Sequence, residues 1–209
     1  MKNEIKKLLD IVTRKGSSKV LSFSIPHVFK ALQMLNNQKY VSRGLFCNEL
    51  HIGEGAVRTL ISHLKQDEIV DTIKAGTFLT QKGKKFTKKF SDVITSQCVI
   101  KSCNIARGKY NHVFLVKNYS KIICNGMDQR DYAIMYGAKS ATTLSFENNK
   151  FVFPNETNDA LKDDVMTKNI LLEKLKPKER DIVIIASSDD PFVSEISAMN
   201  SVLTTLATN

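Results

Sequence analysis

Apolar positions in the first half of the chain repeat with a helical period. Four of them recur at i, i+3, i+4 and i+7 and form the inner stripe of a helix over residues 54–65: Val57, Leu60, Ile61 and Leu64. Hydrogen-bond donors occupy the remaining positions of this helix: Arg58, Thr59, Ser62, His63 and Lys65. A short helix with one apolar and one donor-rich face can pack on a small core and still enter a DNA major groove.

The residues before this helix predict two further helices and a turn. Pro26 stands at a favourable first-turn position for a helix that ends near residues 36–38. Ser42 is expected to cap a second, short helix, and Gly53 is available for a left-handed backbone at the turn that follows it.

The residues after the helix predict a two-stranded wing over residues 69–80. Segments 69–73 and 78–80 are rich in β-formers and flank a tight turn. Thr80 is placed to cap a last helix, from Gln81 to about Val93. Helix, helix, turn, helix and wing is the order of a winged helix-turn-helix.

An additional helix is predicted over residues 3–14, and Gly16-Ser17-Ser18 is expected to end it. Its apolar stripe consists of Ile5, Leu8, Leu9 and Val12. Two partners remain open for this stripe: its own domain, or the same helix in a second chain of a homodimer.

The second half predicts an α/β domain with the order ββαββαβα. Its elements fall at residues 98–105, 112–116, 119–136, 141–146, 151–153, 159–175, 181–185 and 191–206. A mixed sheet with helices on one or both faces is the natural architecture, and a ferredoxin-like sandwich is one such arrangement. The fold class is therefore α+β, with domains at 1–95 and 96–209.

The formal charge is concentrated in the first of these domains. The chain has a net charge of +10; residues 1–95 carry 17 Lys and Arg against 8 Asp and Glu, a net of +9. Such an excess favours binding to a polyanion, because each neutralised phosphate releases counterions.

Two polar clusters in the second half are candidates for binding a small-molecule effector. The first lies around Gly126, Asp128, Arg130 and Asp131, and the second contains Ser187, Ser188 and Asp189. The second cluster follows an apolar strand and precedes a helix beginning at Asp190-Pro191. Strand ends and helix N-termini often bind ligands, but the acidic residues favour capping, hydroxyl recognition or pairing with Arg130. Ordinary structural roles for both clusters remain open.

Metal and catalytic patterns are not evident in the sequence. The four cysteines form no Cys-x-x-Cys pair and do not cluster with the four histidines. The nucleophile-elbow, phosphate-loop and dinucleotide-binding patterns are also missing. We therefore expect no catalytic residues, no metal and no cofactor. Without a membrane-length apolar run or a secretory signal, a cytoplasmic location away from membranes is expected.

Several segments carry a family resemblance. Ile25–Leu32, Gly53–Leu60 and Leu79–Lys84 resemble archaeal winged-helix transcriptional regulators and the DNA-binding domain of the bacterial central glycolytic genes regulator. Segments Gly126–Asp131, Gly137–Leu144 and Asp181–Asp190 are similar to the uncharacterised C-terminal domain attached to that winged helix in archaeal proteins. The resemblance implies a transcription regulator.

The leading hypothesis is a homodimeric regulator that binds double-stranded DNA, with a second domain for effector sensing or dimerisation. Arg58, Thr59, Ser62 and His63 would face the major groove, Lys65 its rim, and Arg43 and Lys74 the phosphates. One alternative is a small-molecule-binding protein or enzyme whose winged domain contacts other proteins. Another is a scaffold that pairs with a second chain through this domain.

Overall fold

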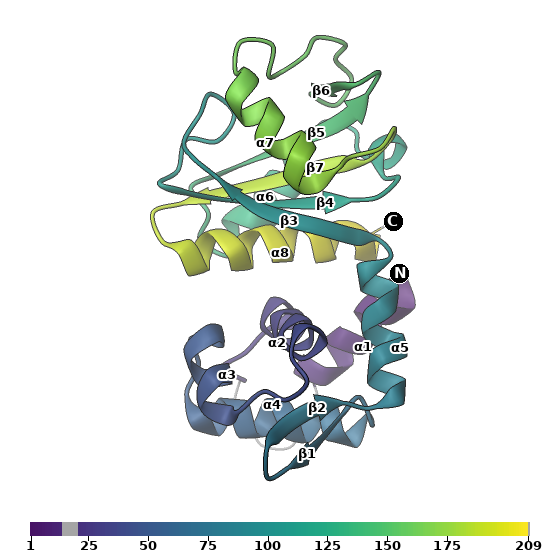
Figure 1. Ribbon diagram of the computed structural model, residues 1–209, viewed down its shortest axis with the longest axis vertical. Coiled ribbons are helices and arrows are strands. Elements are labelled where there is room, and N and C mark those ends of the chain that lie inside the picture. The colour runs from purple at the N-terminus through teal and green to yellow at the C-terminus, as the bar shows by residue number, and fades with distance from the viewer. Residues whose placement is uncertain (14–20, 209) are drawn as a thin grey trace. The chain divides into compact units, whose positions relative to one another are not determined.

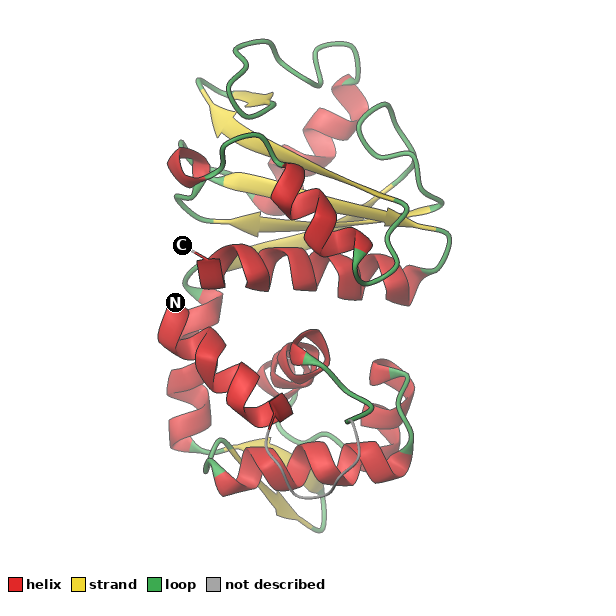
Figure 2. Ribbon diagram, turned by 180° about the vertical axis from the view of Figure 1, so that it is seen from behind, coloured by secondary structure: helices red, strands yellow, loops and turns green. Residues whose placement is uncertain are grey.

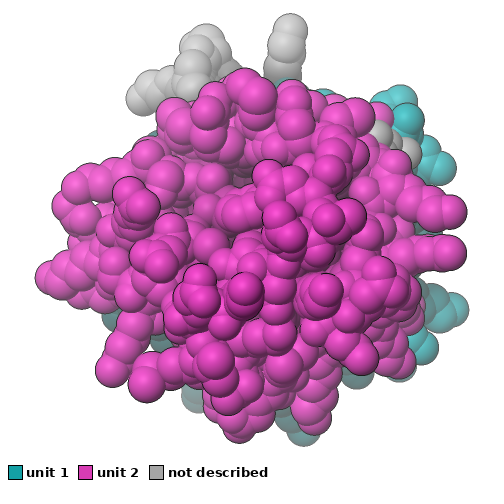
Figure 3. All heavy atoms as spheres, turned by 90° about the horizontal axis from the view of Figure 1, so that it is seen from above, with its two compact units in different colours: residues 1–90 teal, residues 91–209 magenta. Residues whose placement is uncertain are grey.

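The chain divides into two compact units, Met1–Phe90 and Ser91–Asn209, coloured separately in Figure 3. The computed structural model describes residues 1–13 and 21–208. The expected helix end at residues 16–18 lies outside this described part. The predicted boundary between residues 95 and 96 falls inside the first strand of the second unit. That strand begins at Ile94.

The first unit contains five helices and one hairpin within its described residues (Figure 1). They are α1 (Lys2–Thr13), α2 (Ile25–Asn37), α3 (Arg43–Leu50), α4 (Glu54–Gln66), β1 (Val70–Ile73), β2 (Gly76–Leu79) and α5 (Gln81–Ser91). The stripe on α4 is buried as its spacing predicts, with Val57, Leu60 and Leu64 at most 1% exposed. Elements from α2 to α5 thus follow the expected order.

Side-chain caps fix the ends of these helices. The Ser42 hydroxyl accepts a hydrogen bond from the Leu45 amide at 3.1 Å, and the Thr80 hydroxyl accepts one from the Gly83 amide at 3.0 Å. The turn between α3 and α4 differs from the prediction. His51 adopts the left-handed conformation with φ 53°, whereas Gly53 caps α4 with an extended backbone at φ −68°.

The hairpin is bonded near its turn to the segment that precedes α3. Strands β1 and β2 pair antiparallel, and Thr77 exchanges two backbone hydrogen bonds of 2.9 Å with Val41. Gly76 has φ 138°, and a Cβ there would lie 2.7 Å from the Val41 carbonyl oxygen. A glycine is therefore required where the hairpin crosses this segment.

Helix α1 packs against its own unit, which is the first of the two partners considered for its stripe. Ile5, Leu8 and Ile11 are buried, whereas Leu9 is 45% exposed. The Lys7 ammonium lies 2.5 Å from an Asp67 carboxylate oxygen, beyond the end of α4. The helix thereby covers one edge of α4.

His27, in the first turn of α2, makes the stability of the first unit sensitive to acid. Burial, followed by the neighbouring positive charges of Lys30 and His51, lowers the pKa of His27 from the usual 6.5 to about 4. Its Nδ1 also accepts a hydrogen bond from the Ser24 amide at 3.3 Å. Between these two pKa values the unfolded chain binds a proton that the folded chain does not, so stability falls as pH drops from 6.5 towards 4.

Replacing His27 by glutamine should flatten this acid dependence because the side chain no longer titrates. Chemical unfolding at a series of pH values between neutral and 4 measures the effect in both proteins. Parallel curves for wild type and His27→Gln would contradict the assignment.

The second unit is a five-stranded sheet with helices on both faces (Figures 1 and 2). Its elements are β3 (Ile94–Ile100), β4 (Tyr110–Val116), a 3-10 turn (Ser120–Ile122), α6 (Met127–Ile134), β5 (Ser140–Glu147), β6 (Lys150–Val152), α7 (Val165–Leu175), β7 (Ile182–Ser188) and α8 (Pro191–Thr208). The predicted order ββαββαβα is present.

The sheet corrects two expectations about the second unit. Its strand order is β3-β4-β7-β5-β6 and every pairing is antiparallel, so the sheet is not mixed. Strand β7 enters between β4 and β5, which would otherwise be parallel neighbours. A ferredoxin-like sandwich is also wrong because α7 covers one face while α6 and α8 cover the other. Buried along its whole length, β7 needs cover on both faces.

Candidate nucleic-acid interface

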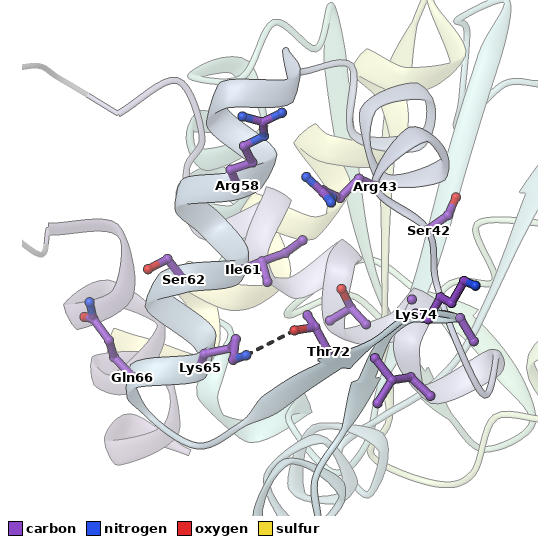
Figure 4. Close-up of a pocket in the computed structure, with 13 residues that line it drawn as sticks. Ser42, Arg43, Arg58, Ile61, Ser62, Lys65, Gln66, Thr72 and Lys74 are labelled. Carbon is purple, nitrogen blue, oxygen red and sulfur yellow. Dashed lines mark hydrogen bonds between the residues drawn. The ribbon is translucent and has the colours of Figure 1, made fainter.

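A groove in the first unit runs between α4, the start of α3 and the β1–β2 hairpin (Figure 4). Its volume is about 840 Å³. Polar and cationic side chains from all three elements line it: Ser42, Arg43, Arg58, Ser62, Lys65, Gln66, Thr72 and Lys74. Five of the seven side chains predicted to contact DNA therefore line one groove.

Helix α4 supplies the floor and one wall of the groove. Its buried stripe faces the core, so the helical period turns Arg58, Ser62 and Lys65 outwards on the opposite side. Gln66 lies on this face as well, although it was not among the residues predicted to contact DNA. The available signal was its spacing, four residues after Ser62 on the same helix.

The other wall carries a cation from each of two elements. Arg43 stands at the first position of α3, where the Ser42 cap fixes the start of the helix. Lys74 lies in the turn between β1 and β2 and makes no ion pair with any residue in the described part of the chain. Figure 4 places Arg43 and Lys74 on the side of the groove opposite α4.

Carboxylates compensate three of the four groove cations. Arg58 Nη2 lies 2.6 Å and Arg43 Nη1 3.8 Å from the same Glu54 oxygen, Oε1. The hydrogen bond from Arg58 is the main cause that lowers the pKa of Glu54. Lys65 Nζ lies 2.9 Å from Asp71 Oδ1 and lowers the pKa of that carboxyl group in the same way.

His63 does not belong to the groove, contrary to the prediction. It is only 7% exposed, its Nδ1 lies 2.8 Å from the Ile11 carbonyl oxygen, and its ring meets Phe23 edge-on. Helix α1 covers this edge of α4. Thr59 is half-buried and its hydroxyl donates to the Gly55 carbonyl at 3.0 Å, so it does not line the groove.

Replacing His63 by alanine should therefore destabilise the first unit. The substitution removes a buried contact and leaves the Ile11 carbonyl without its hydrogen bond from His63. The free energy of unfolding should fall by about 1–3 kcal/mol. Chemical unfolding of the full chain measures this change. If the variant kept wild-type stability but lost sequence discrimination on DNA, His63 would contact DNA and the structural role would be contradicted.

The two polar clusters of the second unit lie at different positions along β5. Gly126, with φ 75°, begins α6 and packs over Thr143 in the middle of β5. Ser187 instead pairs with Ser140, at the start of β5. Thr143 and Ser140 are three residues apart on β5, a distance of roughly 10 Å along the strand.

The charged groups of these clusters bond elsewhere than expected. Arg130 bonds the adjacent Asp131 at 3.0 Å, and Asp128 is an exposed first-turn residue of α6. Asp189 pairs with Lys139 rather than with Arg130. Pairing with Arg130 is therefore wrong for the acidic residues after β7.

The two serines at the end of β7 belong to the local fold. Ser187 and Ser188 are at most 5% exposed, and the Ser188 hydroxyl accepts from the Asp190 amide at 3.3 Å. Asp190 caps α8 by accepting from the Val193 amide at 2.9 Å. The cluster thus forms the strand-to-helix connection.

Across residues 1–13 and 21–208, no three His, Cys, Asp or Glu side chains gather in a way that would hold a metal ion. None of the helices in this part of the chain has the length and apolar character to span a bilayer.

Comparison with known proteins finds a similar family model for a part of each unit. Residues 33–85 match the family described as PH0730-like, N-terminal domain, and residues 107–206 match a domain of unknown function, DUF4443. Among solved structures, the chain is similar to the hypothetical protein PH0730 from Pyrococcus horikoshii OT3. The identity is 23% and the TM-score 0.73, over 90% of this chain and 95% of that chain. No curated protein matches the chain. This chain and PH0730 share a fold.

Proposed function

We propose that the first unit is a winged helix-turn-helix domain that binds double-stranded DNA, and that the protein regulates transcription. One observation carries the proposal: Arg43, Arg58, Lys65 and Lys74 come from three separate elements and line one groove. Helix α4 takes the role of the recognition helix, and the β1–β2 hairpin that of the wing.

The charge distribution supports a polyanionic partner for this unit. Residues 1–90 hold 17 Lys and Arg against 7 Asp and Glu, a net of +10, whereas residues 91–209 hold 14 of each. The formal excess of the chain therefore lies on the unit that contains the groove. Such an excess steers a domain towards DNA and contributes phosphate contacts without sequence information.

The groove separates base-reading from phosphate-binding side chains. Arg58 and Ser62 project from the middle of α4, the position of side chains that reach base edges. Arg58 has the planar fork that binds guanine through two hydrogen bonds. Arg43 and Lys74, on the flanking elements, have the position expected for contacts to the backbone.

A salt titration of the full chain on a mixed-sequence DNA duplex tests the proposal. Each phosphate contact contributes about 0.9 to the slope of log K against log salt. Arg43, Lys65 and Lys74 are the groove cations expected to contact phosphates, so changing all four groove cations to glutamine should reduce that slope by about 2 to 3 and weaken binding strongly.

A second variant matches the loss of charge away from the groove. It changes four exposed lysines of the second unit to glutamine: Lys121, Lys150, Lys162 and Lys174. The proposal expects a much smaller change in slope for this control. Equal losses in both variants, or no binding by the wild-type chain, would refute a DNA-binding groove.

A further inference from the structure

Three of the four groove cations form ion pairs with carboxylates of the same unit. Glu54 and Asp71 together hold Arg43, Arg58 and Lys65, and Lys74 is the one cation of the four without an ion pair among the described residues. This arrangement bears on how the proposed DNA site is regulated, and the inference below rests on that proposed function.

Glu54 is shared between the two arginines of the groove. Both guanidinium groups approach the same oxygen, Oε1, from α3 and from α4. Figure 4 shows Arg43 and Arg58 on these two elements. Arg58 donates a charge-assisted hydrogen bond to this oxygen at 2.6 Å, whereas Arg43, at 3.8 Å, forms an ion pair with it. Glu54 therefore engages groups that DNA would otherwise contact.

Glu54 is also held where a negative charge is favoured. It lies in the first turn of α4, near the positive end of the helix dipole. Its ion pair with Arg58 spans one helical turn, from i to i+4. Both interactions favour the ionised carboxylate at this position.

Asp71, in β1, forms the corresponding ion pair with the third groove cation, Lys65. Lys65 Nζ lies 2.9 Å from Asp71 Oδ1 and 3.0 Å from the Thr72 hydroxyl oxygen, so it is turned from α4 towards β1. The Asp71 carboxylate also accepts from the Thr72 amide at 2.7 Å. This second hydrogen bond fixes the carboxylate beside the groove.

We propose that Glu54 and Asp71 are internal counter-ions that DNA must displace, and that they restrain the affinity of the groove for duplex phosphates. Binding exchanges each carboxylate contact for a DNA contact and leaves the displaced carboxylate close to a polyanion. Both effects oppose binding, with Glu54 the stronger because it engages two cations.

Removing the Glu54 charge tests this restraint on a mixed-sequence duplex at fixed salt. Glu54→Gln should tighten binding by roughly threefold to tenfold, and Asp71→Asn by a smaller factor. Glu68→Gln is the matched control, since Glu68 forms an exposed ion pair at 2.8 Å with Lys82, a cation that does not line the groove. The control should stay within about twofold of wild type.

A double-mutant cycle separates the counter-ion from simple long-range repulsion. In an Arg58→Ala background, Glu54→Gln should raise affinity by a clearly smaller factor, because one of the cations it releases is gone. An equal gain in both backgrounds would overturn the inference, and so would weaker binding by Glu54→Gln in the wild-type background. Failure of the proposed function looks different, because no protein of the series would then bind DNA.

Discussion

Replacing Arg58 by alanine is expected to weaken binding to the protein's preferred DNA sequence by about 1–3 kcal/mol, or roughly 5- to 150-fold. The preferred sequence is obtained by selection from a random pool. Arg58 lies on the outward face of α4, and its side chain is 62% exposed in the groove. A bidentate contact to guanine exists only on the right sequence, so affinity for mixed-sequence DNA should fall much less.

Lys74→Ala is the matched comparison for this result. A lysine on the wing acts as a point charge without a base code, so its loss should weaken binding to both DNAs alike. It should also reduce the salt slope by about one. If Arg58→Ala likewise changed both DNAs by the same factor, Arg58 would not read bases.

Replacing Gly83 by alanine should destabilise the first unit by roughly 3 kcal/mol, at the upper end of the range for overpacking. Gly83 lies in α5, and a Cβ there would stand 2.0 Å from the Ile69 carbonyl oxygen. That oxygen also accepts from the Thr80 amide at 3.1 Å, at the base of the hairpin. The helix and the start of β1 must therefore separate.

Gly44→Ala provides the control for the Gly83 substitution. A Cβ at Gly44, in α3, would meet nothing within 4 Å. Alanine there should leave stability unchanged or raise it by up to about 1 kcal/mol. Chemical unfolding of both variants measures the difference, and equal stabilities would contradict the close packing of α5 on β1.

Local patterns carried the parts of the fold that were predicted well. The stripe on α4 depends only on spacing within one helix, and the caps at Ser42 and Thr80 bond residues three positions away. The outward-facing residues of α4 that line the groove could be predicted as well, because the buried stripe determines which side of the helix faces outwards. Gln66 was missed because the predicted helix ended at residue 65.

Contacts between distant segments account for the errors. His63 is oriented outwards by helical period alone, but α1, 52 residues earlier, covers it. The sheet order depends on where β7, the last strand, inserts, and no local pattern records that position. The cluster around Ser187 resembled a ligand site because a cap and a buried strand end carry the same residue types as a binding loop.

The most direct test of the DNA-binding groove is selection of duplexes from a random-sequence pool by the full chain. The wild-type protein is predicted to enrich a defined sequence, and the variant with glutamine at Arg43, Arg58, Lys65 and Lys74 to enrich none. Enrichment that survives in this variant, or a wild-type chain that retains DNA without any preferred sequence, would contradict base reading through the groove.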